Sequence, residues 1–420
     1  MDPHLLALIA EHNGAAAAAS FFVHMMTFAV GVFHCIPHVR NPSIVEQRLI
    51  WSDCEKRNTR RGAFRRAVRM EKHSFDKLVE SIRSDLVVDK TMAKSRGGPI
   101  VPELCVFCAI RHVAGGSRLD TIDICGTSVP SFCRVLWRTA RAINRCPDLD
   151  LKWPKEDSDV FAAAAALVTV GTNSTVNNCV GVVDGCLLRI STPRKSEAKN
   201  VRSFFSGHCE CHGANVQAAA DHHSRFAHVA MAAPGATGDR DAVKAASLCN
   251  LIEGLPCGRC VTGDPACDAS EHVVPVCDGA DRLNAKHDDF DFCASQLRIR
   301  IEMAFGMMQN KWATPQRPVT CRLKNVSLVV QVTGRLHDCC IAERIAEHGN
   351  DAETAAIPKP NGNGTNVSCL PTEPCDGDGN ALVLSHNVHR LAANSVLREC
   401  MADRVYKRGL KHPETNETNR

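Results

Sequence analysis

Apolar positions between residues 51 and 150 recur with a helical period. Phe75, Leu78 and Ile82 follow one another at three- and four-residue spacing, within a segment, residues 64–84, that predicts a pair of amphipathic helices. Ser74 is a candidate cap for the second helix. Pro102 suits the start of a further helix, and Gly115 suits its end. The pattern therefore predicts an all-α N-terminal domain.

Residues 117–143 have the proportions of a helix-turn-helix, because two helical patterns flank a short turn at Gly126. Many helical domains share that outline. Sequence-specific DNA reading and plain helical packing both remain open for this element.

A different pattern begins near residue 150, where Pro147 and Pro154 bracket a polar break. An alanine-rich helix over residues 161–170 comes first. Short β-rich runs then predict a buried strand that ends on Asp184, a continuation or partner over 187–190, a hairpin over 215–231, and a strand that ends on Asp264. Strands that alternate with helices indicate an α/β fold with a mixed sheet and flanking helices.

Three longer helices are expected among and after these strands. One begins at Asp239, one covers residues 291–312 and carries Glu302 beside its apolar face, and one covers residues 323–347. These patterns divide the chain into an apolar helical segment (1–50), a helical domain (51–150), an α/β domain (151–348), a disordered linker (349–382), and a C-terminal helix with a basic tail (383–420).

The apolar segment from Ala15 to Ile36 is long enough to cross a bilayer. No basic residue precedes it, and its alanine run is only weakly hydrophobic. We therefore expect a buried or partner-docking helix here and no membrane partner.

Composition and charge narrow the class of protein without identifying it. The 420 residues are 44% apolar, which is ample for one large core and a smaller helical domain. The net charge of +4 is too small to indicate a polyanionic partner, but residues 56–72 hold eight cations that could face phosphate. The 23 cysteines are odd in number and follow no secretory leader, which favours a reducing compartment.

Four acidic residues are candidates for chemistry. Asp184 and Asp264 both end apolar strands at the same expected sheet edge, Glu302 lies on a packed helix, and Asp239 begins one. Each alone is explained well enough as a turn former or a cap. Together they would repel unless neutralised, and such oxygen ligands suit Mg²⁺ or Mn²⁺ rather than zinc. Two such ions imply phosphoryl transfer at a phosphodiester.

Cysteine and histidine pairs suggest a competing zinc site. His208-Cys-Glu-Cys-His212 and Cys257-x-x-Cys260 are the candidates, but no second pair stands at a finger-like spacing in so cysteine-rich a chain. We interpret Cys105 and Cys108, which lie on a predicted helix among apolar residues, as core side chains.

An ordered set of motifs between residues 180 and 345 resembles the PIF/Harbinger transposases and their domesticated nuclease relatives. The set comprises Gly181-Val-Val-Asp184-Gly, Phe205-Ser-Gly207, His212-Gly-Ala-Asn-Val-Gln217, Pro234-Gly-Ala-Thr-Gly-Asp239, Gly263-Asp264, Arg298-Ile-Arg-Ile-Glu302-Met-Ala-Phe-Gly306 and Arg335-Leu-His337-Asp338. The resemblance implies a ribonuclease-H-like fold, a DDE nuclease that depends on a divalent metal, and DNA as substrate. It also implies a Myb/SANT-like partner protein and a nuclear location. Strand transfer after cleavage and homo-oligomerisation are left open.

Departures from the family pattern leave two questions open. The chain has Cys267 where the family commonly has tyrosine, His208 where it has lysine, and Met308-Gln309 where it has Leu-Lys. A catalytically inactive, transposase-derived DNA- or protein-binding protein is therefore the alternative function. The second acid of the triad is also undecided, since strand position favours Asp264 and the motif retains Asp239.

Overall fold

The computed structural model describes residues 48–88, 99–170, 176–265, 267–276, 285–349 and 396–410, with residues 396 and 397 as backbone only. All of these described residues belong to one structural unit. The predicted segment over residues 1–50 and the predicted linker over residues 349–382 lie almost entirely outside the described residues. Within the described part of the chain, no helix combines the length and the apolar character needed to cross a membrane.

Only helices are found in the described residues from 51 to 170. They are α2 (Trp51–Arg60), α3 (Phe64–Val68), α4 (Lys72–Leu86), α6 (Pro102–Val113), α7 (Arg118–Cys125), α8 (Val129–Arg145), the 3-10 turn η1 (Pro147–Leu149) and α9 (Asp157–Val170). Gly126, in the left-handed conformation with φ 58°, ends α7, and the Ser128 hydroxyl accepts the Ser131 N–H at the start of α8. Two helices and a glycine turn are therefore present where the helix-turn-helix was predicted.

The sheet is mixed, with six strands. These are β1 (Cys179–Arg189), β2 (Phe205–Ser206), β3 (Cys211–Ala220), β4 (Phe226–Pro234), β5 (Cys260–Gly263) and β6 (Val273–Pro275), arranged in the order β2-β3-β1-β5-β6 with β4 also paired to β3. The first four pair antiparallel, whereas β5 and β6 run parallel to β1. The short 3-10 turn η3 (Val201–Phe204) precedes β2.

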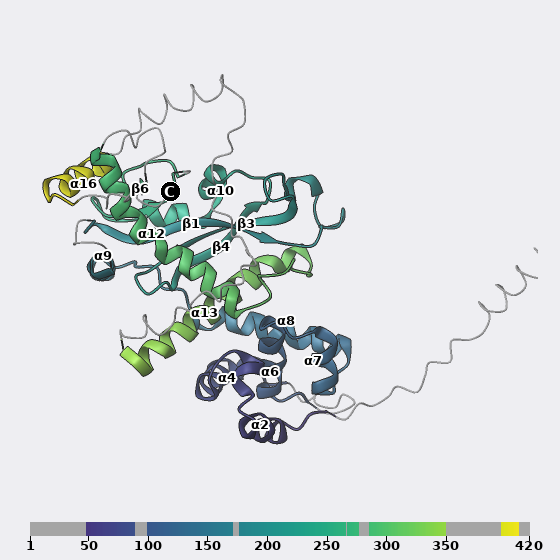
Figure 1. Cartoon of the computed structure of the whole chain (residues 1–420). Helices are drawn as coiled ribbons and strands as arrows, with labels where there is room; N and C mark the ends of the chain where they lie inside the picture. Colours follow the sequence, from purple (N-terminus) through teal and green to yellow (C-terminus); the bar gives the residue numbers. More distant parts are fainter. Residues whose placement is uncertain are drawn as a thin grey trace, which may run out of the picture. The chain divides into compact units, whose positions relative to one another are not determined.

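Helices cover both faces of this sheet (Figure 1). The longest, α12 (Ala285–Lys311), and α13 (Val326–His348), which the short turn η5 (Leu323–Asn325) precedes, pack on the face that presents Val182, Val216 and Phe226. On the other face, α9, α10 (Asp239–Ala245) and α11 (Ser247–Glu253) enclose a second apolar cluster that includes Val180 and Val183. The C-terminal helix α16 (Val396–Lys407) packs against α12.

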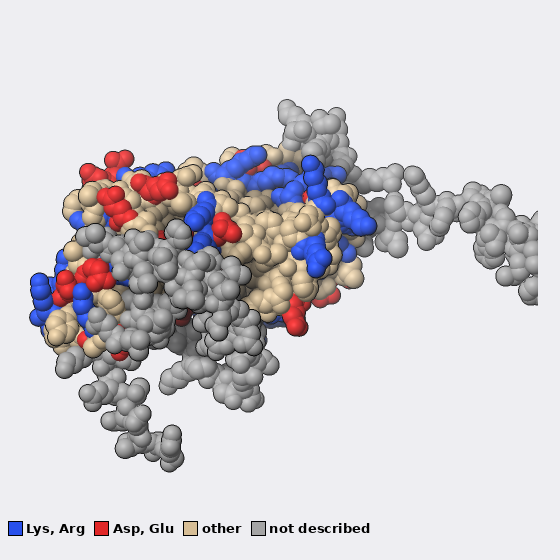
Figure 2. Space-filling view, turned by 90° about the horizontal axis from the view of Figure 1, so that it is seen from above, with Lys and Arg blue, Asp and Glu red and all other residues tan. Residues whose placement is uncertain are grey.

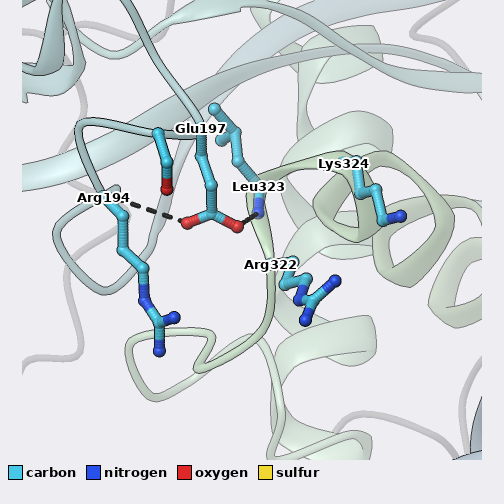
Figure 3. A pocket seen from close by; sticks show the side chains of 6 residues that line it. Arg194, Glu197, Arg322, Leu323 and Lys324 are labelled. Atoms are coloured by element: carbon cyan, nitrogen blue, oxygen red, sulfur yellow. Dashed lines mark hydrogen bonds between the residues drawn. The ribbon is translucent and has the colours of Figure 1, made fainter.

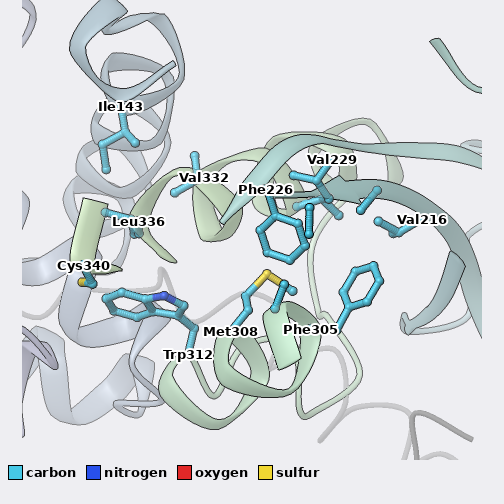
Figure 4. Packing of buried hydrophobic residues seen from close by; sticks show 14 of the residues in the cluster. Ile143, Val216, Phe226, Val229, Phe305, Met308, Trp312, Val332, Leu336 and Cys340 are labelled. Atoms are coloured by element: carbon cyan, nitrogen blue, oxygen red, sulfur yellow. The ribbon is translucent and has the colours of Figure 1, made fainter. Parts of the chain in front are cut away.

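Trp312 lies at the centre of the larger core. Its fully buried ring faces Met308, Leu336 and Cys340, and Ile143 of α8 approaches from the helical part of the chain (Figure 4). The core of the sheet therefore continues into the N-terminal helices. Burial of such large side chains contributes roughly 1.5–3 kcal/mol each.

Two residues near the middle of α13 attach this helix to the turn between β3 and β4. The Phe226 N–H donates to Asp338 Oδ1 at 2.8 Å, and His337 Nε2 lies 2.9 Å from the Ser224 carbonyl oxygen. Burial raises the pKa of Asp338 well above its ordinary value, and the Phe226 N–H opposes that shift. The Leu-His-Asp sequence therefore has a structural role in this protein.

Asp338→Asn is expected to stabilise the protein at neutral pH. The amide oxygen can still accept the Phe226 N–H, while a buried negative charge disappears, worth about 1–3 kcal/mol. Because the folded-state pKa is raised, wild-type stability falls as pH rises above the unfolded value near 3.9, so the gain grows with pH. Urea unfolding of the full chain at pH 5 and pH 8 measures this. The exposed Asp85→Asn is the control, and a variant less stable than wild type at pH 8 would contradict the interpretation.

Several local predictions are corrected by the structure. Ser74 is not a cap, because α4 begins at Lys72 and its N-cap Glu71 makes no side-chain bond. The strand predicted to end on Asp184 instead runs on to Arg189, which confirms that residues 187–190 continue it. The helix predicted from Asp239 to Leu251 is divided at Ala246, whose ψ of 141° is extended.

Candidate active site

Asp184 lies in the middle of β1, on the sheet face that α12 covers. Its register partner is Ala218 of β3, and residues directly opposite in an antiparallel pair share a face. Asp184 Oδ1 accepts the N–H of Gly185 at 2.7 Å. Burial raises the pKa of Asp184 to about 7; Arg298 and the Gly185 N–H oppose the shift, and Asp264 and Glu302 add to it. A carboxylate inside a sheet of apolar neighbours needs a cation, and α12 provides one.

Asp264 follows the last residue of β5 directly. Since β5 runs parallel to β1 with Val182 beside Thr262, the register brings Asp264 alongside Asp184. Gly263 permits this close approach, because an added Cβ would meet the Val183 side chain at 2.8 Å. The structure brings together the two acids that were predicted to end strands at one sheet edge, but only Asp264 follows a strand end, since Asp184 lies within β1.

Arg298 of α12 joins three of the four predicted acids. Its Nη2 lies 3.9 Å from Asp184 Oδ2, 3.8 Å from Asp264 Oδ2 and 3.4 Å from Glu302 Oε1. Each of the three carboxylate oxygens lies within 3.9 Å of the same nitrogen atom. The distance between any two of these oxygens is therefore at most twice that value. Glu302 reaches the group because it stands one helical turn after Arg298.

Exposure differs among the members of this Arg298 cluster. The side chains of Arg298, Asp184 and Asp264 are 18%, 21% and 23% exposed, whereas Glu302 is 58% exposed. The cluster therefore has a buried base formed by two strands and an open side next to Glu302. Glu302 is therefore the member of the cluster that is most accessible to solvent or a ligand.

Asp239 is held by a different set of contacts. Its Oδ1 accepts from Asn215 Nδ2 at 3.0 Å, and Asn215 Oδ1 accepts from Gln217 Nε2 at 2.8 Å. Gln217 pairs with Gly185, so these amides lie on the sheet face opposite to Asp184. The structure therefore groups Asp264, rather than Asp239, with Asp184 and Glu302.

Cys267 lies between the two sets of acids. Burial, with Asp264, Asp184 and Asp239 nearby, raises the pKa of its thiol to about 12. Without a bound metal ion, a thiol with that pKa stays protonated at neutral pH and is a poor nucleophile. Where the family commonly has tyrosine, this chain thus has a neutral, buried side chain.

The donor set of the cluster is suited to a hard divalent cation, since carboxylate oxygens are the ligands that Mg²⁺ and Mn²⁺ prefer. As the side chains stand, no group of three or more His, Cys, Asp or Glu residues in the described ranges is arranged to hold a metal ion. The Arg298 guanidinium lies within 4 Å of all three carboxylates and offsets part of their charge. Its Nε is buried and has no hydrogen-bond partner in the described part of the chain.

The zinc candidates are not brought together. Cys257 is exposed and Cys260 is buried in β5, where the hydrogen bond with the Cys179 thiol, together with burial, raises the pKa of Cys260. Cys105 and Cys108 are buried in α6, as expected of core residues.

Sequence reasoning did not identify Arg298 as the centre of the site. The available signal was its four-residue spacing from Glu302. It also did not assign the buried Asn215 and Gln217, whose signal is two amides at alternate positions of an otherwise apolar strand. Arg298 contacts Asp184, Asp264 and Glu302, and Asn215 contacts Asp239, so these residues orient the acids.

Comparison with protein-family models gives one result for this chain. Residues 183–338 match the model described as DDE superfamily endonuclease. Comparison with curated proteins and with solved structures gives no match. Less than half of the chain is matched, but the matched segment contains Asp184, Asp239, Asp264 and Glu302. The match supports a relation of this segment to the DDE superfamily endonucleases.

Proposed function

We propose that this protein is a divalent-metal-dependent DNA endonuclease of the DDE type, with a ribonuclease-H-like fold. The observation that carries the proposal is the convergence of Asp184, Asp264 and Glu302 on one guanidinium, within the segment that matches the endonuclease family. The sheet supports the fold assignment, because three antiparallel strands, β4, β3 and β1, are followed by the parallel β5 and β6.

The protein's own contribution to catalysis is a rigid carboxylate set. Asp184 and Asp264 are fixed by adjacent parallel strands, and Glu302 is fixed by a helix packed on the same sheet face. Mg²⁺ or Mn²⁺ bound to these residues would polarise an attacking water and steady the leaving oxygen of a phosphodiester, the two-metal chemistry of nucleases. Asp239, held by Asn215 outside this group, is then not one of the metal-binding acids. A Myb/SANT-like partner and a nuclear location remain predictions.

Cleavage of supercoiled plasmid DNA tests this function. We expect nicking with Mg²⁺ or Mn²⁺ and none in EDTA, and a loss of about 10³-fold or more for Asp264→Asn and Glu302→Gln. Asp239→Asn is expected to keep at least about a tenth of the rate, because Asn can still accept the Asn215 N–H. The exposed Asp241→Asn, on the same helix, is the matched control.

The alternative function predicts a different outcome. A catalytically inactive descendant of a transposase would bind DNA without metal and would produce no nicks under any condition. Equal residual nicking by wild type and Asp264→Asn would also support the inactive alternative, because the nicks would then come from a contaminating nuclease.

A further inference from the structure

A pocket lined by cations lies between two loops at the far end of β1. One loop follows β1 and the other precedes α13, and together they enclose about 580 Å³ (Figure 3). The lining residues are Arg194, Ser196, Glu197, Arg322, Leu323 and Lys324. None of the four predicted acids is among them, so this pocket is separate from the Arg298 cluster.

Glu197 connects the two loops through hydrogen bonds. Its Oε2 accepts the Arg194 N–H at 3.3 Å, and its Oε1 accepts the Leu323 N–H at 3.3 Å. Both carboxylate oxygens are thus engaged by backbone donors rather than by the cations. Figure 3 shows the guanidinium groups of Arg194 and Arg322 extending to the same side of this carboxylate.

The three cations of the pocket have no partners within the described part of the chain. The side chains of Arg194, Arg322 and Lys324 form no ion pair or hydrogen bond there, whereas Lys72, Lys77 and many other cations are paired with carboxylates. Like charges gathered without a partner raise the energy of the free protein. An anion from outside would relieve that repulsion.

The same strand connects the pocket to the candidate active site. Beyond Asp184, β1 continues to Arg189, and Ile190 then forms a parallel bridge to Val319 of the second loop. Six residues of extended chain from 184 to 190 span about 20 Å.

We propose that this pocket binds a backbone phosphate of the DNA that is cut, at a point along the duplex away from the cleaved phosphodiester. The inference rests on the proposed function for the position of the cut, but the pocket's preference for phosphate rests on its own residues. Two guanidinium groups on one side can hold a phosphate by paired N–H donors, and Lys324 adds a third positive charge. Figure 2 shows Lys and Arg side chains gathered over one part of a molecular face, as a path for DNA requires.

Fluorescence anisotropy with a duplex of about 30 base pairs, in EDTA and at several salt concentrations, tests the pocket without cleavage. Arg194→Gln and Arg322→Gln are each expected to weaken binding roughly three- to tenfold near 0.1 M salt. The double variant should also lower the slope of log Kd against log salt by about 0.9, the value for one lost phosphate contact, and each single variant by less. Lys77→Gln is the control, because it removes the same charge from a cation that Glu343 already neutralises.

The outcomes separate this proposal from the proposed function. If both pocket variants keep the wild-type Kd and salt slope and their wild-type thermal stability, the pocket proposal is overturned, whatever the cleavage assay shows. If inorganic phosphate stabilises the wild type but the variants bind DNA normally, the pocket binds a free anion and the proposal also fails. Variants that weaken DNA binding in a protein that never cuts would support the pocket and contradict only the nuclease.

Discussion

Replacing Asp184 with asparagine is expected to abolish DNA cleavage and at the same time to stabilise the metal-free protein. Cleavage should fall by about 10³-fold or more, because Asn can no longer supply a negative oxygen to a divalent cation. Stability should rise because burial disfavours the ionised form of the Asp184 carboxyl in the folded protein and raises its pKa to about 7. Asparagine has no charge to bury at that position.

The pH dependence of that gain follows from the direction of the shift. The pKa of Asp184 is about 7 in the folded protein and near 3.9 in the unfolded chain, so the folded state binds more protons between these values. Wild-type stability therefore falls as pH rises from about 4 to about 7. The advantage of Asp184→Asn should be about 2–4 kcal/mol above pH 7 and should vanish toward pH 4, since each pKa unit is worth about 1.4 kcal/mol.

Urea unfolding in EDTA at pH 5 and pH 8.5 measures this advantage, alongside plasmid nicking with Mn²⁺. Glu302→Gln is the matched control, because it removes an acid of the same cluster that is 58% exposed and should lose cleavage without becoming more stable. A destabilised, inactive Asp184→Asn would mean that Asp184 is needed for folding, and the assignment of a functional carboxylate would lose its support.

The sequence could predict the acids but not how they are held. Strand patterns placed Asp184 and Asp264 on adjacent parts of one sheet, and the α/β class, the β3–β4 hairpin and the α12 helix all agree with the structure. Periodicity could not show that β1 continues past Asp184, because a charged residue in an apolar run resembles a strand end. That charge is tolerated only because Arg298 lies opposite, which is a tertiary contact.

Asp239 illustrates the same limit. The sequence alone does not distinguish Asp239 from Asp264, because each of them follows a glycine. The distinction comes from register: Gln217 lies opposite Gly185 and Ala218 opposite Asp184, so the amides that hold Asp239 face away from the Arg298 cluster. Register between strands distant in sequence is not encoded in any local pattern. The division into domains and the catalytic role of each acid stay predictions.

Arg298→Gln is expected to have opposite effects on the metal-free and metal-bound protein. Without the guanidinium, three carboxylates face one another, and the loss of one partner of a largely buried ion pair costs about 3–5 kcal/mol in EDTA. The same change removes a positive charge from within 4 Å of the oxygens that would bind a divalent cation. Mn²⁺ should therefore bind at least about tenfold more tightly to the variant.

Isothermal titration with Mn²⁺, together with thermal unfolding in EDTA and in saturating Mn²⁺, measures both effects independently of cleavage. Arg298→Lys should restore the wild-type Mn²⁺ affinity, because it returns the charge although not the planar fork. Arg300→Gln is the control, since two residues along the helix turn its side chain about 200° from the acids. If Arg298→Gln binds Mn²⁺ no better than wild type, Arg298 does not compete with the cation. The guanidinium would then serve only to hold β1, β5 and α12 together, and the metal would have to bind elsewhere on these acids.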